Sequence, residues 1–355
     1  MNQQSLDTLL LTALSLGASD LHLSAGAPPM MRINSLMEPA SADILMPGDT
    51  ADAVAALCND DISKRIAHKG SMDFSYAIAG QGRFRVSVFK QRGAYSLSFR
   101  LCAQTPPDEA QLGLPDAVKE LAGRKSGLVV LSGIARSGKS TTAAWLINNI
   151  AATRPGHIIT IEEPIEVLFR HGRGLVNQKE IGLDAPDRLT ALAASLREDP
   201  DVLYISSAND GETLSLAIDA ALGGKLVVCV LDTPNAAATL QYIVDVAQDA
   251  NKSRVQSQLA EALAAVVSHQ LVACGMHRVA LFEVLLNSDA VKGILRENKL
   301  PQINKVIESS AQAGMQTFDM ALARRVVDQQ LTLEEAESAI TDRQKFRHYL
   351  LELDR

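Results

Sequence analysis

The segment at residues 133–140 combines residue types and a spacing that suit phosphate binding. It has the sequence GIARSGKS and fits the pattern G-x-x-x-x-G-K-[ST]. Glycines let backbone N–H groups turn towards phosphate oxygens, and a following helix N-terminus adds partial positive charge. Lys139 can reach the β- and γ-phosphates of a nucleotide, and the hydroxyl of Ser140 can ligate Mg²⁺. These residues predict a site for ATP and Mg²⁺.

The sequence on either side of this loop supports that prediction. The apolar run 128–131 before the loop is typical of a buried strand, and residues 141–150 after it have a helical pattern. A chance match in a glycine-rich turn is the alternative, but it does not explain the strand before the loop and the helix after it. We therefore interpret the loop as a nucleotide site.

Hydrolysis of a nucleotide needs carboxylates near the phosphates, and one acidic cluster follows a predicted strand. It contains Glu162, Glu163 and Glu166, after the apolar run 158–161. In doubly wound sheets, ligands bind at the carboxyl ends of the strands. The other interpretation is that these acids only solvate a strand end. The run 202–205, by contrast, is followed by SSAN and reaches no carboxylate before Asp210.

Short apolar runs alternate with helical segments in the middle of the chain and predict an α/β fold. They lie at 128–131, 158–161, 202–205 and 226–231. Continuous runs of this kind suit strands that are covered by helices on both faces. Beyond residue 251 the pattern is mostly helical, with one strand expected at 279–285. Helices are expected there at 290–297, 318–327 and 333–340.

The N-terminal part predicts a small α+β unit. Apolar residues recur at helical spacing from Leu6 to Leu14, and Gly17 ends that helix. Alternating residues predict strands at 20–24, 72–79, 83–91 and 95–101, with Phe84, Val86 and Val88 on one face. The sequence Thr-Pro-Pro at 105–107 interrupts the pattern and predicts a linker.

The composition is that of a folded chain. Of its 355 residues, 47% are hydrophobic and 21% are charged, which excludes a disordered chain. A net charge of −7 argues against a surface made for nucleic acid. We find no apolar run long enough to span a bilayer and no signal peptide. Four cysteines without close spacing predict free thiols in a reducing, cytoplasmic compartment.

Several of these segments together resemble the PilT/PilU-type retraction ATPases of type IV pili, a branch of the secretion ATPase superfamily. The likeness is carried by IARSGKSTT, TIEEPIE, LVNQKEIG, ALAASLREDPD and GMQTFDMAL, and near the N-terminus by SDLHLSAGAPPMMRIN and GRFRVSVFKQRGAYSLSFR. It runs from about Leu6 to Ile340. It implies a PAS-like N-terminal domain at 1–104, a linker at 105–115, a RecA-like P-loop NTPase domain at 116–285 and a helical C-terminal region at 286–355.

Residue by residue, the resemblance also implies functional roles. The Walker A loop contains Gly133, Ser137, Gly138, Lys139, Ser140 and Thr141, with Ser140 as the Mg²⁺ ligand. An acidic box that orients the lytic water contains Glu162, Glu163 and Glu166, with Glu163 where the family usually has Asp. Four arginines lie where the family has arginine fingers that reach the nucleotide of a neighbouring subunit: Arg83, Arg85, Arg92 and Arg100. Ordinary solvation of an exposed strand is the alternative for these arginines.

The chain departs from the family pattern at the ends of two strands. Where the family has Gly-Glu-Met-Arg-Asp, this chain has SSAND, so Ser207 replaces the Walker B glutamate and Asn209 an arginine. Asp232 replaces the histidine of the His box. A serine cannot accept a proton at neutral pH, and the loss of a positioned acid–base group typically costs about 10²- to 10⁴-fold in rate.

Two interpretations of these departures stay open. One is a motor ATPase whose hydrolysis is weak or rewired through Asp210, Glu212 or Asp232. The other is a non-hydrolysing paralogue that binds ATP and regulates or scaffolds a partner ATPase ring.

The resemblance implies an assembly as well. It is a homo-hexamer, or a mixed ring with a paralogous ATPase, that serves pilus retraction and twitching motility. Such a ring would act on an inner-membrane platform protein of the pilus, and would be cytoplasmic and peripheral at the inner face of the membrane. Residues 289–297, DAVKGILRE, resemble a C-terminal family motif linked to retraction, and an amphipathic surface helix is the alternative.

Overall fold

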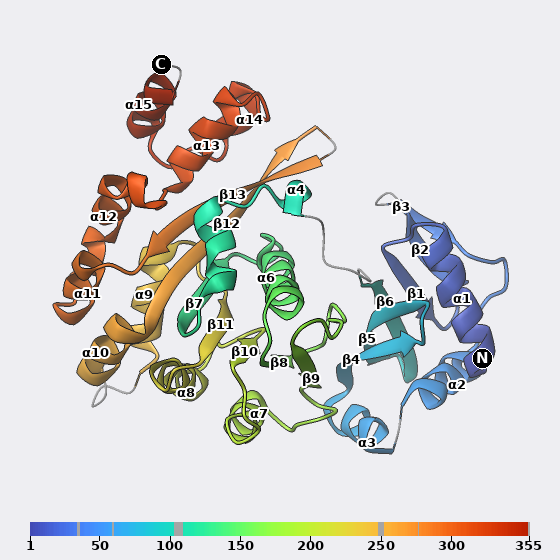
Figure 1. Cartoon of the computed structure of the whole chain (residues 1–355). Helices are drawn as coiled ribbons and strands as arrows, with labels where there is room; N and C mark the ends of the chain where they lie inside the picture. The colour runs from blue at the N-terminus through green and yellow to red at the C-terminus, as the bar shows by residue number, and fades with distance from the viewer. Residues whose placement is uncertain (34–35, 59, 103–108, 248–251, 276, 354–355) are drawn as a thin grey trace. The chain divides into compact units, whose positions relative to one another are not determined.

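The computed structural model describes residues 1–33, 36–58, 60–102, 109–247, 252–275 and 277–353 (Figure 1). The chain divides into two compact units. Unit 1 consists of Met1–Thr105, Glu163–Leu168 and Gly182–Asp184, and unit 2 consists of Pro106–Glu162, Phe169–Ile181 and Ala185–Arg355. The linker expected at 105–107 lies outside the described residues.

Unit 1 is an antiparallel sheet with helices packed on it around one core. The sheet has the order β3-β2-β1-β6-β5-β4. Its strands are β1 (Asp20–Ser24), β2 (Met30–Ile33), β3 (Leu36–Pro39), β4 (Ser71–Ile78), β5 (Gly82–Gln91) and β6 (Ala94–Leu101), and its helices are α1 (Gln3–Ser15), α2 (Pro47–Leu57) and α3 (Asp60–Lys69). The expected helix and all four expected strands are confirmed, and Phe84, Val86 and Val88 are fully buried on one face of β5.

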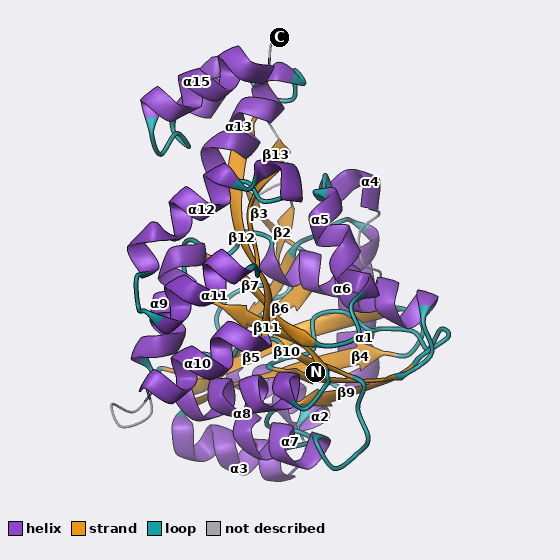
Figure 2. Ribbon diagram, turned by 60° about the vertical axis from the view of Figure 1, so that its left-hand side comes forward, coloured by secondary structure: helices purple, strands orange, loops and turns teal. Residues whose placement is uncertain are grey.

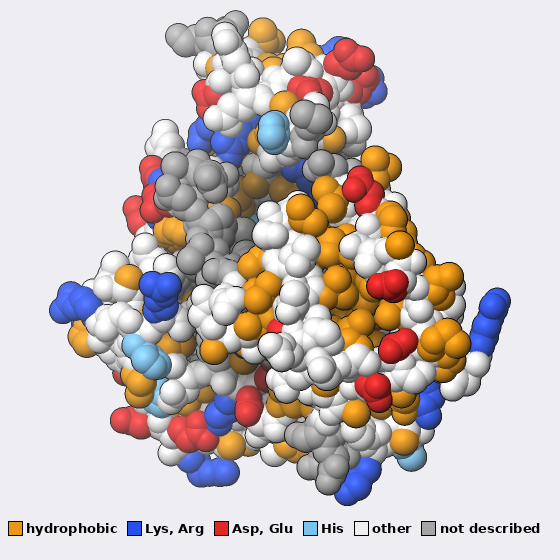
Figure 3. Space-filling model, turned by 90° about the vertical axis from the view of Figure 1, so that its right-hand side faces the viewer, with side chains coloured by type: hydrophobic (Ala, Val, Ile, Leu, Met, Phe, Trp, Pro, Cys, Tyr) orange, Lys and Arg blue, Asp and Glu red, His pale blue; other side chains and the backbone are white. Residues whose placement is uncertain are grey.

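Unit 1 also has hydrophobic side chains on its surface. Leu36 in the edge strand β3 is 66% exposed, and Ile44 and Met46 after it are each 63% exposed. Figure 3 shows hydrophobic side chains gathered on one face of the molecule. Exposed apolar residues beside an edge strand are typical of a surface that contacts another protein.

Unit 2 is built on a seven-stranded sheet with the order β13-β12-β7-β11-β10-β8-β9. Its strands are β7 (Gly127–Gly133), β8 (His157–Glu162), β9 (Leu175–Glu180), β10 (Val202–Ile205), β11 (Leu226–Leu231), β12 (Leu263–Cys274) and β13 (His277–Leu286). Every neighbouring pair is parallel except β12 and β13. This arrangement confirms the α/β fold expected for the P-loop domain.

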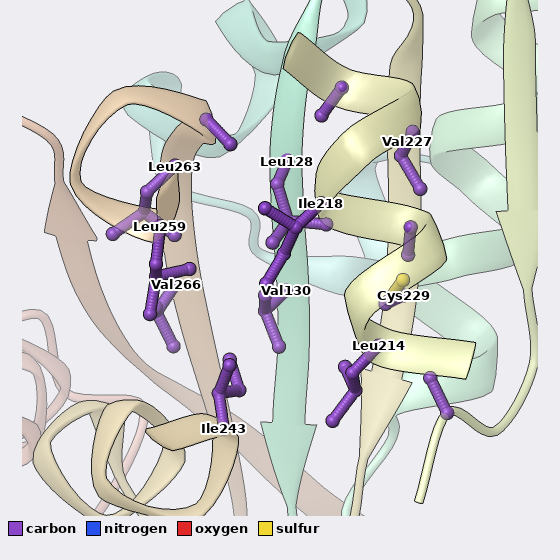
Figure 4. Close-up of a cluster of buried hydrophobic side chains, with 14 of the residues drawn as sticks. Leu128, Val130, Leu214, Ile218, Val227, Cys229, Ile243, Leu259, Leu263 and Val266 are labelled. Carbon is purple, nitrogen blue, oxygen red and sulfur yellow. The ribbon is translucent and has the colours of Figure 1, made fainter. Parts of the chain in front are cut away.

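Helices cover both faces of this sheet (Figure 2). The α-helices of unit 2 are α4 (Glu109–Leu112), α5 (Asp116–Lys119), α6 (Lys139–Thr153), α7 (Arg188–Ser195), α8 (Gly211–Leu222), α9 (Ala236–Asp245), α10 (Lys252–Ala262), α11 (Asp289–Arg296), α12 (Ile303–Ser309), α13 (Phe318–Val327), α14 (Leu333–Glu337) and α15 (Arg343–Leu353). Alternate residues of β7 enter two separate cores. Leu128 and Val130 pack with residues of α8, α9 and α10 (Figure 4), whereas Val129 and Leu131 pack with α6.

The structure corrects the expectation for the chain beyond residue 251. Residues 263–274 form the strand β12, which lies between β7 and β13, and not a helix. Both faces of this strand are covered, so it lacks the polar alternation that distinguishes a half-buried strand from an apolar helix. The expected strand near 279–285 and the helix at 318–327 are confirmed.

The helix α11 carries the motif-like sequence at 289–297. Val291, Ile294 and Leu295 are buried against the unit 2 core, while Lys292 and Arg296 both pair with Glu261. The apolar face of this helix is therefore used for packing within unit 2. Among the described residues, the structure contains no helix that is both long and apolar enough to cross a membrane.

Candidate functional site: the nucleotide pocket of unit 2

The strand order brings the predicted chemical groups to one edge of the sheet. The strands β7, β11, β10 and β8 are consecutive and parallel, so their carboxyl ends lie side by side. The phosphate-binding loop follows β7, Asp232 follows β11, Ser207 and Asn209 follow β10, and Glu162 ends β8. Ligands of such sheets bind at this edge.

The loop after β7 has the backbone that phosphate binding requires. Gly133 has a φ of 147° and Gly138 a φ of 102°, which are left-handed values that favour glycine. A Cβ on Gly133 would clash with Ser137 Oγ and lie 2.6 Å from the carbonyl oxygen of His269. The hydroxyl of Ser137 is buried and has no hydrogen-bond partner. A turned loop with an unpaired buried hydroxyl fits a phosphate ligand.

The helix α6 begins at Lys139, directly after this loop. Ser140 and Thr141 lie in its first turn with exposed side chains, which suits the predicted contacts with Mg²⁺ and phosphate. The loop residues expected to bind nucleotide therefore lie together between β7 and α6.

The ammonium group of Lys139 is buried and contacts both the loop backbone and Asp232. Its Nζ donates to the carbonyl oxygens of Gly133 at 2.6 Å and Ile134 at 2.8 Å, and it lies 3.0 Å from Asp232 Oδ1. Only 8% of the Lys139 side chain is exposed, against 61% for Asp232. Lys139 therefore makes two hydrogen bonds to the loop backbone and an ion pair with Asp232.

The residues that depart from the family pattern form one polar cluster. The side-chain amide of Asn209 donates to Ser207 Oγ at 3.0 Å and to Asp232 Oδ2 at 3.4 Å. The hydroxyl of Tyr242 in α9 donates to the carbonyl oxygen of Asn209 at 2.6 Å. The carboxylate of Asp232 is thus held between Asn209 and Lys139.

The other two acids considered as substitutes have different surroundings. Asp210 is the N-cap of α8, where its Oδ1 accepts from the N–H of Thr213 at 2.7 Å. Glu212 lies in the first turn of the same helix. Of the three candidates, Asp232 is therefore the one that contacts the lysine of the loop.

The structure places the acidic cluster in two units. Glu162 belongs to unit 2 and is buried, and its Oε1 accepts from Thr160 Oγ1 at 2.6 Å and from Gln178 Nε2 at 2.9 Å. Glu163 and Glu166 belong to unit 1. The side chain of Glu162 is buried and hydrogen-bonded to residues of β8 and β9. It therefore does more than solvate the end of a strand.

The four arginines of unit 1 have distinct surroundings. Arg83 Nε donates to the carbonyl oxygen of Ile165 at 3.0 Å, and Arg85 lies 3.0 Å from Asp73 and 4.0 Å from Glu166. Arg100 Nε pairs with Asp20 at 3.0 Å. Arg92 lies in the turn after β5 with a φ of 48°. Arg83, Arg85 and Arg100 therefore have partners within unit 1, and their predicted finger role stays a prediction.

Two buried groups close to the loop were not assigned a functional role from the sequence. Burial, together with the positive charge of nearby Lys139, lowers the pKa of His269 to about 4. Its Nδ1 lies 3.0 Å from the carbonyl oxygen of Ser132. Burial raises the pKa of Glu283 to about 7, although this carboxyl accepts from the N–H of Ala236 at 2.7 Å. Glu283 thereby holds the start of α9, just after Asp232. Its partner is 47 residues away in sequence, so no local pattern could have revealed the contact.

Glu283 also lines a cavity of about 510 Å³ in unit 2, together with Asp319, Glu308 and Lys345. Asp319 accepts from the N–H groups of Thr341 and Asp342, and Lys345 pairs with Glu308. These charged groups of the cavity therefore link β13 to α9, α13 to the chain before α15, and α12 to α15.

A mostly parallel sheet with a phosphate-binding loop between its inner strand β7 and the helix α6 defines a P-loop NTPase with a RecA-like domain. Comparison with known proteins gives the family. The model of the family described as "Type II/IV secretion system protein" matches residues 3–349, and the chain belongs to this family, as a PilT/PilU-type secretion ATPase.

Its relatives are similar over most of their length. The chain is 38% identical to the uncharacterised protein YggR of Escherichia coli, over 87% of this chain and 94% of that protein. It is 36% identical to the type IV pilus retraction ATPase PilT of Pseudomonas aeruginosa, over 90% of this chain and 93% of PilT. A crystal structure of the pilus retraction motor PilT with bound ADP matches with a TM-score of 0.87 and 36% identity, over 97% of this chain and 98% of that one.

Proposed function

We propose that this chain binds ATP with Mg²⁺ in unit 2 and works as a subunit of the type IV pilus machinery. The observation that carries the proposal is the loop between β7 and α6, where left-handed glycines, the unpaired hydroxyl of Ser137 and the buried ammonium of Lys139 come together. The relatives support it, because one is a pilus retraction ATPase and a solved PilT structure contains ADP.

The roles of individual residues follow from general phosphate chemistry. The backbone N–H groups of the loop would hold the phosphates, and Lys139 would offset their negative charge. Ser140 would hold Mg²⁺, which offsets charge on the β- and γ-phosphates when it is bound. Glu162, buried at the end of β8, would orient the water that attacks, together with Glu163 and Glu166. The arginines Arg83, Arg85, Arg92 and Arg100 would supply a finger to the nucleotide of a neighbouring subunit.

We propose further that hydrolysis is weak or rewired. Ser207 stands at the end of β10 where the family has a glutamate, and a hydroxyl can neither take up a proton at neutral pH nor offer a charged ligand. The second candidate function is a pseudo-ATPase that binds ATP and regulates or scaffolds a partner ATPase ring. The ion pair of Lys139 with Asp232, beside its two hydrogen bonds to the loop backbone, favours that candidate.

The proposed assembly is a hexameric ring, or a mixed ring with a paralogous ATPase. We propose that it contacts an inner-membrane platform protein of the pilus from the cytoplasmic side. The exposed hydrophobic side chains of unit 1 support an assembly of this kind, because exposed apolar side chains beside an edge strand favour contact with another protein.

Steady-state phosphate release tests the choice between the two functions. The purified chain is compared with Lys139→Ala, and ATP binding is measured on the same samples. Release clearly above that of the variant identifies a motor ATPase. Release equal to that of the variant, with ATP still bound by the natural chain, identifies a pseudo-ATPase. Absence of ATP binding would contradict both.

A further inference from the structure

The contact between Asp232 and Lys139 places a negative charge at the phosphate site. Asp232 Oδ1 lies 3.0 Å from Lys139 Nζ, and its other oxygen lies 3.4 Å from the side-chain amide of Asn209. The ammonium also donates hydrogen bonds to two carbonyl oxygens of the loop itself. Asp232 is therefore the only charged partner of Lys139 among the described residues, and it comes from outside the loop.

The distance limits where a bound phosphate can lie. A phosphate oxygen that accepts from Lys139 would lie about 2.8 Å from its Nζ. Because Asp232 Oδ1 lies 3.0 Å from the same atom, that oxygen lies within about 6 Å of the carboxylate. Charges this close repel one another appreciably when one of them is partly buried.

The γ-phosphate is affected more than the β-phosphate. In a loop of this type, backbone N–H groups enclose the α- and β-phosphates, and the lysine reaches the β- and γ-phosphates. The γ-phosphate therefore relies on the lysine more than the β-phosphate does. Asp232 follows β11, the neighbour of β7, and its carboxylate contacts the ammonium from outside the loop. The carboxylate therefore competes with the γ-phosphate for Lys139.

We propose that Asp232 is a specificity-determining residue that shifts the nucleotide preference of this site from nucleoside triphosphates towards nucleoside diphosphates. This inference rests on the proposed nucleotide binding. It accounts for an intact phosphate-binding loop in a chain whose strand ends have lost the acid and the base of the family pattern, because such a site still holds ADP. Mg²⁺ weakens the preference without abolishing it, since it offsets part of the γ-phosphate charge.

Competition binding with ADP and ATP tests the proposal. The affinities of the full chain and of Asp232→Asn for both nucleotides are measured in EDTA and in MgCl₂. Removal of the charge is expected to raise the affinity for ATP about tenfold in EDTA and the affinity for ADP less than threefold, with a smaller gain for ATP in MgCl₂. Asp232 is exposed, and Asp232→Ala is expected to change the ratio of the two affinities in the same direction.

Asp210→Asn is the matched control. It removes one negative charge from the neighbouring loop, and asparagine caps a helix as well as aspartate does, so the ratio is expected to stay unchanged. An equal change for ADP and ATP in Asp232→Asn, or no change, overturns the proposal. Weaker ATP binding in MgCl₂ alone also overturns it and identifies the carboxylate as a magnesium ligand. A natural chain that binds neither nucleotide, like Lys139→Ala, overturns the proposed function as well.

Discussion

The two sides of the nucleotide site of unit 2 differ in how closely they keep the features that phosphate chemistry requires. The loop between β7 and α6 has left-handed glycines, a buried lysine and an unpaired hydroxyl. The ends of β10 and β11 have Ser207 and Asp232, which are joined through Asn209. One side is therefore suited to bind a nucleotide, while the other lacks the groups that are expected to cleave it. Under the proposed function, binding and hydrolysis depend on separate parts of the sheet edge.

The largest effect is expected for Lys139→Ala, which removes the one ammonium that the loop contains. The affinity for ATP should fall by about 100-fold or more, because a charge-assisted contact to phosphate is lost and Asp232 loses its positively charged partner. Equilibrium titration with ATP measures the change. The control is Lys125→Ala, an exposed lysine of unit 2 just before β7. Unchanged affinity in Lys139→Ala would show that the loop is not the nucleotide site.

A large effect on the rate of hydrolysis, and not on binding, is expected for Ser207→Glu, which restores an acid at the end of β10. If the acid is the only missing group, phosphate release should rise by about 10²- to 10⁴-fold. Ser207→Gln has the same size without the charge and should show no rise. No gain in Ser207→Glu would mean that Asp232, or the geometry of the site, also blocks hydrolysis. The double variant with Asp232→His then distinguishes these two explanations.

A smaller effect, on stability, is expected from Glu283, which holds the start of α9 next to Asp232. Its pKa in the folded chain is about 7, above its ordinary value of 4.5. The folded state therefore holds this proton more tightly than the unfolded state does. The resulting stabilisation is fully present below about pH 4.5 and is lost as the pH rises through 7, with a total of roughly 3 kcal/mol.

Urea unfolding at pH 5.5, 7 and 8 measures this dependence. Glu283→Gln keeps the acceptor for the N–H of Ala236 and removes the titration, so its free energy of unfolding should fall less between pH 5.5 and pH 8 than that of the natural chain. The exposed Glu334→Gln serves as the control and should follow the natural chain. An equal change of the free energy of unfolding with pH in Glu283→Gln and in the natural chain would contradict the raised pKa of Glu283.

The smallest effect is expected for Gly133→Ala, which strains the loop. The left-handed φ and the crowding by Ser137 and His269 should cost about 1–3 kcal/mol in the free energy of unfolding. Gly123→Ala is the control, because a Cβ there meets nothing within 4 Å and its φ is not left-handed. A thermal melt compares the two. Equal melting temperatures would show that the loop adapts without strain.

Local patterns were sufficient where a residue's neighbours in sequence are also its neighbours in space. The loop at 133–140, the helix at 318–327 and the strand pattern of Phe84, Val86 and Val88 all agree with the structure. The strand β12 was missed because a strand buried on both faces has no alternation to mark it. The links of Glu162 to Gln178 and of Glu283 to Ala236 were missed because they join separate elements.

The sequence by itself determined the class of this protein, its phosphate-binding loop and the absence of the expected acid and base at Ser207 and Asp232. Those features depend on residue type and short spacing, which a chain carries before it folds. Only the tertiary structure decided that Asp232, and not Asp210, contacts Lys139. The reason is the order of the parallel strands, which sets β11 directly beside β7 and β10 one strand further away.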